Sequence, residues 1–225
     1  MERYVSKGFN QAYLTRQLDL IPISKLGMPI TVIGAGAVGS NTVLQLARMG
    51  FGNITVIDFD EVSEENMNSQ GYFTTHIGRK KVECLQEMVK LAIGFDIKVE
   101  DKYYIDDNLT GLVISAVDSM EVRKNIWENC TNAEYIIDPR MAAEFATLAV
   151  MKRSSGKDLA DYVKTLYTDD EAIHESCTAK ATVYCANLLS GLVTKAVKDI
   201  ATGNPYTRFV HWNIRENALD QYLSE

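Results

Sequence analysis

The sequence predicts an α/β fold in which helices cover both faces of a mostly parallel sheet. Short apolar segments rich in β-branched residues alternate with segments of helical periodicity. A glycine cluster stands between the first strand-like segment and the first helix-like segment, and two later apolar segments end on an aspartate. Strands that alternate with helices form parallel sheets, because each crossover helix packs on a face of the sheet.

The first strand-helix-strand unit covers about 30 residues. Residues 29–33 are apolar and largely β-branched, residues 34–39 read Gly-Ala-Gly-Ala-Val-Gly, and residues 40–49 have helical periodicity with a narrow polar stripe. Two glycines end this helix, and residues 53–58 predict the second strand. A strand, a glycine turn, a helix and a second strand in this order predict a Rossmann-like core.

The same alternation continues to the end of the chain. Residues 60–75 predict a long loop, and residues 78–91 return to helical spacing. The later expected elements are strands near 97–104, 112–117 and 135–138, a helix up to residue 131, an antiparallel strand at 145–151, a long helix over 178–202 and a last strand over 209–214.

Composition excludes several classes of protein. The 225 residues include 23 Lys plus Arg against 30 Asp plus Glu, a net charge of −7, which disfavours binding to nucleic acid or anionic membranes. No segment approaches the ~20 apolar residues that span a bilayer, and the first residues do not resemble a secretory signal. Four sparse cysteines without a Cys-x-x-Cys pair predict a cytoplasmic protein without structural zinc.

The glycine cluster is a GxGxxG motif in the context that favours nucleotide binding. Gly34 allows a sharp turn, Gly36 lets a phosphate approach the backbone, and Gly39 lets the helix pack closely. The start of the following helix presents free N–H groups to an anion. Asp58, at the end of the second strand, is placed to contact ribose hydroxyls. These features predict a nucleotide but do not separate NAD from ATP.

Two later segments favour ATP over NAD. Residues 58–66 read Asp-Phe-Asp-Glu-Val-Ser-Glu-Glu-Asn, and residues 77–81 read Ile-Gly-Arg-Lys-Lys. Hydride transfer needs neither segment. Together with the glycine motif, they resemble the ThiF, MoeB and HesA family of adenylating enzymes, which is related to the ubiquitin-activating enzymes. The resemblance runs from about residue 13 to residue 203.

The resemblance implies ATP and magnesium as cofactors. The ATP-binding residues that it implies are Gly34, Gly36, Ala37 and Gly39 in the phosphate loop, Asp58 on the ribose, Asn66 and Lys81 on the phosphates, and Asp118 on magnesium, with Asp60 as a further cofactor-binding residue. A lysine and a carboxylate-bound cation would together neutralise the triphosphate and its pyrophosphate leaving group. The alternative for each polar residue is a solvated charge on a loop or helix end.

Arg16 and Cys177 are candidates outside this core. Arg16 lies in an Arg-Gln segment like the one whose arginine, in the family, reaches the ATP of the neighbouring subunit, so the resemblance implies a homodimer. Cys177 precedes the long final helix, whose N-terminus would lower the thiol pKa and favour a nucleophile. The alternatives are a surface arginine and a structural cysteine.

One position departs from the family pattern. Ser69 stands where the family has an arginine, and a serine cannot bind phosphate oxygens bidentately. We expect Arg79, Lys80 or Arg140 to compensate, with weak ATP turnover as the alternative, and we expect the basic residues to converge on phosphate. Arg140 is further expected to bind a phosphate or an acceptor carboxylate, oriented by Glu144, with a structural ion pair as the alternative.

The expected chain organisation is a single domain. Its parts are an N-terminal helical segment (1–28), a nucleotide-binding core (29–151), a crossover or lid loop (152–177) and a C-terminal helix and strand (178–225). The expected function is ATP-dependent adenylation of the C-terminal carboxylate of a small ubiquitin-like or sulfur-carrier protein or a peptide, with release of pyrophosphate. Alternatives are an NAD-dependent oxidoreductase, a non-catalytic nucleotide-binding subunit, and adenylation of a small molecule or RNA base.

Overall fold

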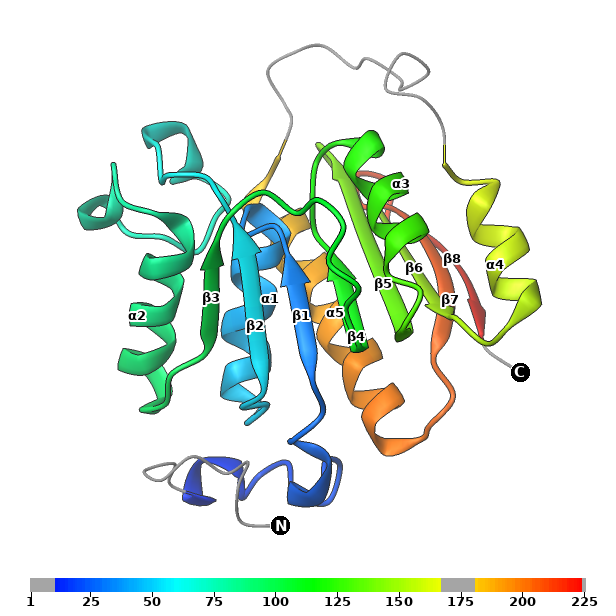
Figure 1. Cartoon of the computed structure of the whole chain (residues 1–225), viewed down its shortest axis with the longest axis horizontal. Coiled ribbons are helices and arrows are strands. Elements are labelled where there is room, and N and C mark those ends of the chain that lie inside the picture. The colour runs from blue at the N-terminus through cyan, green and yellow to red at the C-terminus, as the bar shows by residue number, and fades with distance from the viewer. Residues whose placement is uncertain (1–10, 167–180, 224–225) are drawn as a thin grey trace.

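A computed structural model describes residues 11–166 and 181–223 (Figure 1). One sheet of eight strands runs through the molecule in the order β3-β2-β1-β4-β5-β6-β7-β8. The strands are β1 (Ile30–Ile33), β2 (Ile54–Asp58), β3 (Lys98–Asp101), β4 (Gly111–Ser115), β5 (Ala133–Ala142), β6 (Phe145–Lys152), β7 (Thr207–Asn213) and β8 (Ala218–Leu223). The α-helices are α1 (Ala37–Arg48), α2 (Lys81–Ile93), α3 (Met120–Asn129), α4 (Gly156–Val163) and α5 (Val183–Thr202).

The pairing of the strands confirms the predicted α/β class. Strands β3, β2, β1, β4 and β5 are parallel to one another, whereas β6, β7 and β8 continue the sheet in antiparallel pairs. The strand expected to be antiparallel at 145–151 is β6. The parallel part alternates with helices because each crossover must return the chain to the same edge of the sheet.

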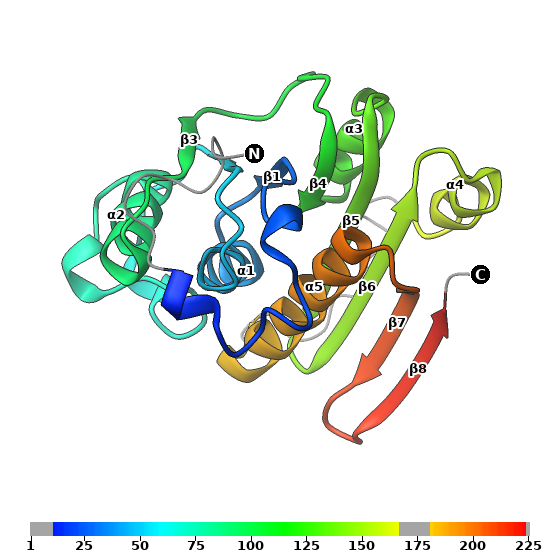
Figure 2. The ribbon, with the colours of Figure 1, turned by 90° about the horizontal axis from the view of Figure 1, so that it is seen from below.

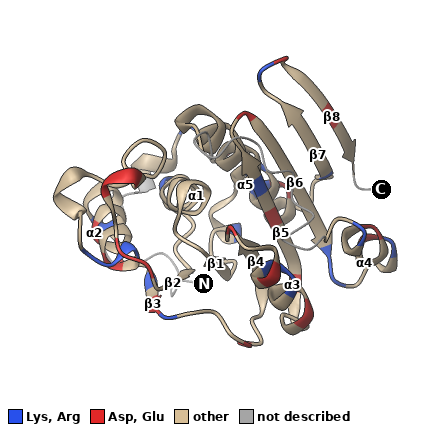
Figure 3. Ribbon diagram, turned by 90° about the horizontal axis from the view of Figure 1, so that it is seen from above, with Lys and Arg blue, Asp and Glu red and all other residues tan. Residues whose placement is uncertain are grey.

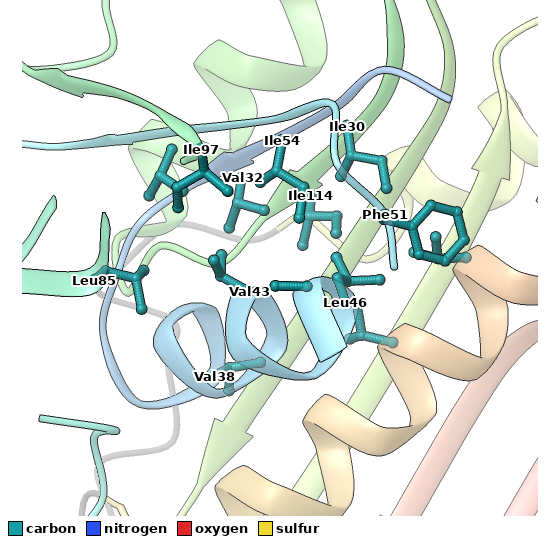
Figure 4. Packing of buried hydrophobic residues seen from close by; sticks show 14 of the residues in the cluster. Ile30, Val32, Val38, Val43, Leu46, Phe51, Ile54, Leu85, Ile97 and Ile114 are labelled. Atoms are coloured by element: carbon teal, nitrogen blue, oxygen red, sulfur yellow. The ribbon is translucent and has the colours of Figure 1, made fainter. Parts of the chain in front are cut away.

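Helices cover both faces of the sheet and enclose two cores (Figure 2). Helices α1, α2 and α5 pack on one face, where Val32 and Ile114 meet Val43 and Leu46 of α1 (Figure 4). Helices α3 and α4 pack on the other face, where Ile33 belongs to the second core. Adjacent strand residues thus enter different cores because side chains alternate along a strand.

The strand order places a switch point between β1 and β4. The chain moves from β1 outward through β2 and β3 on one side, then crosses to β4 and β5 on the other. The carboxyl ends of these parallel strands lie at the upper edge in Figure 1. In open α/β sheets, ligands bind where the connections diverge at this edge. The loops after β1, β2 and β4 therefore form the candidate site.

Three elements differ from the sequence prediction. Helix α4 lies within residues 152–177, which were expected to form a loop, and strand β8 was not expected. The predicted N-terminal helical segment contains only short 3₁₀ turns, Gln11–Leu14 and Ile23–Lys25, in its described part. Further 3₁₀ turns, Glu64–Asn66 and Thr74–His76, interrupt the long loop after β2. Among the residues described, no helix combines the length and apolar character needed to cross a bilayer.

Candidate nucleotide site

The glycine loop joins β1 to α1 and leaves room for a ligand at one position only. Gly34 has φ +95°, and a Cβ there would lie 2.5 Å from the carbonyl oxygen of Ala116. A Cβ on Gly39 would lie 1.9 Å from the carbonyl oxygen of Gly34. A Cβ on Gly36, by contrast, would meet no atom within 4 Å. The first and third glycines therefore serve close packing, and the second faces open space.

The start of α1 presents backbone N–H groups beside this open space. Gly36 is the N-cap of α1 and has no side chain that could cap the helix. The first N–H groups of a helix have no partner within the helix, and the helix dipole favours an anion at this end. The geometry of the loop therefore suits a phosphate, as the motif predicts.

Asp58 and Tyr72 hold the glycine loop in shape from below. The Asp58 carboxylate accepts hydrogen bonds from the backbone N–H groups of Ala35 at 2.6 Å and Asp60 at 2.7 Å. The Tyr72 hydroxyl donates to the carbonyl oxygen of Ala35 at 2.7 Å. Burial raises the pKa of Asp58, while these N–H donors and the charge of Lys81 oppose that rise. Tyr72 belongs to no motif, so the sequence alone gives no signal for its role.

Lys81 is a buried lysine at the first position of α2. Its side chain is 7% exposed, and its Nζ lies 2.8 Å from Oδ2 of Asp60, whose side chain is 45% exposed. A lysine at a helix N-terminus opposes the helix dipole, and its burial costs solvation energy. The ion pair with Asp60 offsets part of this cost, and Lys81 lies beside the loop after β2. Asp58 and Asp60 differ in their exposure to solvent, since Asp58 is buried under the glycine loop and Asp60 lies at the surface.

The loop after β2 packs against the first turns of α1. The Asn66 side chain accepts from the N–H of Ser63 at 3.1 Å. The carbonyl of Ser69 accepts from the Asn41 amide at 3.2 Å, and the Ser69 side chain is buried. Ser69, the residue that replaces the family arginine, therefore lies against α1. Asn66 occupies a turn that is fixed by its own side chain.

Asp118 lies across the switch point from the glycine loop. The loop after β4 touches both packing glycines, since the Cβ built on Gly39 lies 3.3 Å from Cβ of Ala116 and that on Gly34 lies 3.2 Å from the N of Val117. Asp118 follows directly and is exposed. The structure thus brings the loop of Asp118 against the phosphate loop, as the motif order predicts.

The expected convergence of the other basic residues is not observed. Arg79 pairs with Glu87 at 2.5 Å, and Lys80 lies within 3.6 Å of both Glu61 and Asp101. Figure 3, which looks onto the carboxyl edge, shows Lys and Arg interspersed with Asp and Glu around α2, α3 and α4. Arg79 and Lys80 are therefore each paired with nearby carboxylates.

Arg140 forms the structural ion pair that was the alternative for this residue. Its guanidinium pairs with Asp138 at 2.7 Å and donates to the carbonyl oxygen of Thr165 at 2.8 Å. The expectation that Glu144 orients Arg140 is wrong, because the Glu144 carboxylate bonds to the Tyr184 hydroxyl at 2.5 Å and to Arg215 at 2.9 Å.

Arg16 lies at the opposite end of α1 from the glycine loop. The neighbouring Gln17 donates from Nε2 to the carbonyl oxygen of Met49, directly after α1, at 2.5 Å. Arg16 itself is exposed. Since α1 has 12 residues and is about 18 Å long, Arg16 cannot reach the glycine loop of its own chain. A role at a phosphate would require a second copy, as the resemblance implies.

Two other sequence expectations concern metal and thiol chemistry. Cys177 lies outside the described residues. Within the described part of the chain, no group of three His, Cys, Asp or Glu side chains could hold a metal ion. Magnesium commonly binds through one or two carboxylates and shares its remaining sites with phosphates and water. Asp118 beside a phosphate loop fits that mode of binding, whereas an all-protein magnesium cage does not.

A separate cleft of about 710 Å³ lies between α4 and the β7–β8 hairpin. Its lining includes Asp161, Thr165, Arg208 and Tyr222. None of the residues predicted to bind ATP lines this cleft. The cleft is therefore distinct from the candidate nucleotide site.

The fold and the site together define a Rossmann-like α/β protein with a glycine loop, a buried lysine and an exposed carboxylate at one edge of the sheet. The model of the ThiF family matches residues 24–222, and the chain belongs to this family.

Similar proteins include enzymes that are longer than this chain. The NEDD8-activating enzyme E1 catalytic subunit of Arabidopsis thaliana is 36% identical over 107 residues, which cover 43% of this chain and 23% of that protein. The tRNA threonylcarbamoyladenosine dehydratase of Haemophilus influenzae is 33% identical over 110 residues, covering 45% and 42%. The matched region thus spans less than half the length of these relatives.

A solved structure of E. coli MccB with AMPCPP and MccA has the same fold. The TM-score is 0.70 at 13% identity, and the match covers 91% of this chain and 66% of that one. At this identity the likeness establishes the fold alone.

Proposed function

We propose that this protein is an ATP-dependent adenylyltransferase. It would join the C-terminal carboxylate of a small ubiquitin-like or sulfur-carrier protein, or of a peptide, to the α-phosphate of ATP and release pyrophosphate. The observation that carries the proposal is the meeting of three features at one sheet edge: the open position at Gly36, the buried Lys81, and the loop of Asp118. Each of these features suits a phosphate or its counter-ion.

The residues of the chain would act by binding and positioning. The N–H groups at the start of α1 hold phosphate oxygens, and Lys81 turns from Asp60 to the negative charge of the triphosphate. We assign the ribose contact to Asp60, since Asp58 accepts two backbone hydrogen bonds beneath the loop. Asp118 would hold magnesium together with the phosphates, and the cation would supply further neutralisation of their charge. The acceptor carboxylate is already a nucleophile, so no general base is required.

The names of the relatives support the choice of acceptor. They include a NEDD8-activating enzyme and a ubiquitin-like modifier-activating enzyme. The dehydratase among the relatives bears a tRNA nucleoside in its name. The net charge of −7 disfavours an RNA acceptor, and we therefore propose a polypeptide. Arg16 would complete the site from the second copy of a homodimer.

Pyrophosphate exchange tests this proposal. With its acceptor, the protein should exchange labelled pyrophosphate into ATP, and both Lys81→Ala and Asp118→Asn should abolish the exchange. Lys90→Ala is the matched control, because Lys90 lies on the same helix, is exposed and pairs only with Asp96 in the described structure. Exchange that survives both site variants would contradict the residue assignment. Binding of NAD in preference to ATP would contradict the whole proposal.

A non-catalytic nucleotide-binding subunit is the second candidate. The observation that favours it is the absence, within the described residues, of a direct substitute for the family arginine. Ser69 faces α1, and Arg79 and Lys80 are paired with carboxylates. Tight ATP binding without exchange, tested with acceptors of each proposed class, would favour this candidate.

A further inference from the structure

The loop that carries Asp118 is anchored on both sides of that residue. The N–H of Ala116 donates to the carbonyl oxygen of Ile33 at 2.8 Å. The Ser119 hydroxyl accepts from the N–H of Val122 at 3.3 Å and caps α3. The carbonyl of Val117 accepts from the guanidinium of Arg123. Asp118 alone among residues 116–119 is exposed, and these anchors flank it on both sides.

Arg123 ties the end of β4 to the middle of β5. Besides Val117, its guanidinium donates to the carbonyl oxygens of Ser115 and Pro139, each at 3.2 Å. It also forms an ion pair with Asp138. A buried arginine that donates to several carbonyls fixes the backbone in a way that a single point charge cannot, because its donors are held in one plane. Arg123 therefore fixes the end of β4, and the loop that follows it, against β5.

Asp138 is the centre of this arrangement and is fully buried. Its carboxylate accepts from Arg123, from Nε of Arg140 at 2.8 Å and from the Tyr162 hydroxyl at 2.8 Å. Two guanidinium groups thus share one carboxylate, and the cluster keeps a net positive charge near the loop of Asp118. This charge favours an anion at the carboxyl edge of the sheet.

The cluster also reaches the end of α4. Arg140 donates to the carbonyl oxygen of Thr165 at 2.8 Å and to its hydroxyl at 3.1 Å. Tyr162 lies on α4, and its ring packs at 4.6 Å from that of Trp127 on α3. Through its two arginine partners and Tyr162, the Asp138 carboxylate therefore joins β5 to the end of β4 and to α4.

We infer that Arg123, Asp138, Arg140 and Tyr162 form a positioning cluster that fixes the β4–α3 loop beside the glycine loop, where Asp118 would share a divalent cation with a bound triphosphate. This inference rests on the proposed function for the role of Asp118. The four residues do not touch the nucleotide. They act on it through the β4–α3 loop, and groups that orient a metal ligand affect metal affinity strongly.

Binding of Mn²⁺ in the presence of a non-hydrolysable ATP analogue tests the cluster without relying on activity. Electron paramagnetic resonance counts free Mn²⁺, and thermal unfolding reports whether each variant is folded. Arg123→Lys keeps the charge but loses the planar donors, and we expect about tenfold weaker Mn²⁺ binding. Tyr162→Phe removes one hydrogen bond to Asp138 and keeps the ring, and we expect a smaller loss.

Arg153→Lys is the matched control. Arg153 also attaches α3, since it donates to the carbonyl oxygen of Trp127 at 3.1 Å and lies over the Trp127 ring at 4.4 Å. It acts at the opposite end of the helix from Asp118, so its replacement should leave Mn²⁺ affinity unchanged even where it lowers the unfolding temperature.

The outcomes separate the cluster from the proposed reaction. Weaker Mn²⁺ binding in Arg123→Lys and Tyr162→Phe supports the cluster, even if the wild-type protein shows no pyrophosphate exchange, in which case only the proposed reaction fails. Unchanged Mn²⁺ binding in folded Arg123→Lys and Tyr162→Phe overturns the cluster and leaves the reaction standing. A wild-type protein that binds no Mn²⁺ with the analogue overturns both.

Discussion

Gly36 and Gly39 lie at the start of α1. Replacing each by alanine in turn should show that Gly39 matters for stability and Gly36 for nucleotide binding. In Gly39→Ala, the new Cβ would lie 1.9 Å from the carbonyl oxygen of Gly34, whereas real Cβ contacts are essentially never shorter than 3.0 Å. The helix and the loop must therefore separate by about 1 Å, and both atoms concerned belong to rigid backbone. Overpacking of this kind costs ~1–3 kcal/mol, and the better helix propensity of alanine returns at most ~1 kcal/mol.

We expect a net loss of about 2 kcal/mol for Gly39→Ala, because backbone rather than a flexible side chain must move. In a domain of this size the loss lowers Tm by about 4–8 °C. Gly36→Ala is the matched variant. Its φ of −77° suits alanine, and its Cβ meets no atom within 4 Å. Its Tm should stay within about 2 °C of the wild-type value.

For ATP affinity, in contrast to stability, Gly36→Ala should have the larger effect of the two variants. The Cβ of Gly36→Ala occupies the space through which a phosphate approaches the N–H groups of α1, so one or two charged hydrogen bonds are lost. At ~1.5–3 kcal/mol in total, ATP affinity should fall about 10- to 100-fold. Thermal unfolding and titration calorimetry measure both quantities. If Gly36→Ala binds ATP like the wild type, or Gly39→Ala unfolds at the wild-type temperature, the geometry of the loop has been misread.

Three further perturbations address other parts of the molecule. Mixing Arg16→Ala with Lys81→Ala copies should restore about a quarter of the wild-type exchange activity, because half of the random dimers carry one intact site of two. If no activity returns, Arg16 does not contribute to the nucleotide site of the partner subunit. Ser69→Arg should lower Tm without raising ATP affinity, since Ser69 is buried against α1. The control Asn68→Arg, at an exposed position, should leave Tm unchanged. A gain in ATP affinity in Ser69→Arg would show that Ser69 limits the site. Burial lowers the pKa of His76 below its ordinary 6.5, so the unfolded chain takes up a proton first and stability falls as the pH drops below 6.5. In His76→Gln the denaturation midpoint should therefore depend less on pH over that range. A pH dependence equal to that of the wild type would argue against this origin.

Local sequence patterns accounted for the elements that bear the candidate site. The glycine motif predicted the β1–α1 turn, and the structure supplies a reason for each glycine, two for packing and Gly36 for open space. The apolar, β-branched segments predicted β1, β2 and β4, because a strand buried on both faces is apolar at nearly every position. The motif order also predicted that Asp118 and Lys81 would follow strands or begin helices at the same edge.

The elements that the sequence did not predict lack such a local signal. Every residue of β8 is exposed, so no alternation marks it, and it forms because β7 supplies hydrogen-bond partners. Helix α4 buries only Asp158 and Tyr162, of which one is charged, so its sequence resembles that of a polar loop. In both cases a neighbouring segment decides the local structure.

The sequence by itself determined which residues could carry the chemistry, because motif spacing and strand ends follow from local geometry. The tertiary structure alone decided how those residues are partnered. It paired Arg140 with Asp138 instead of Glu144, placed Ser69 against α1, and set Tyr72 beneath the glycine loop. Charge pairing and burial depend on distances between segments that are remote in the chain, and no single segment encodes them.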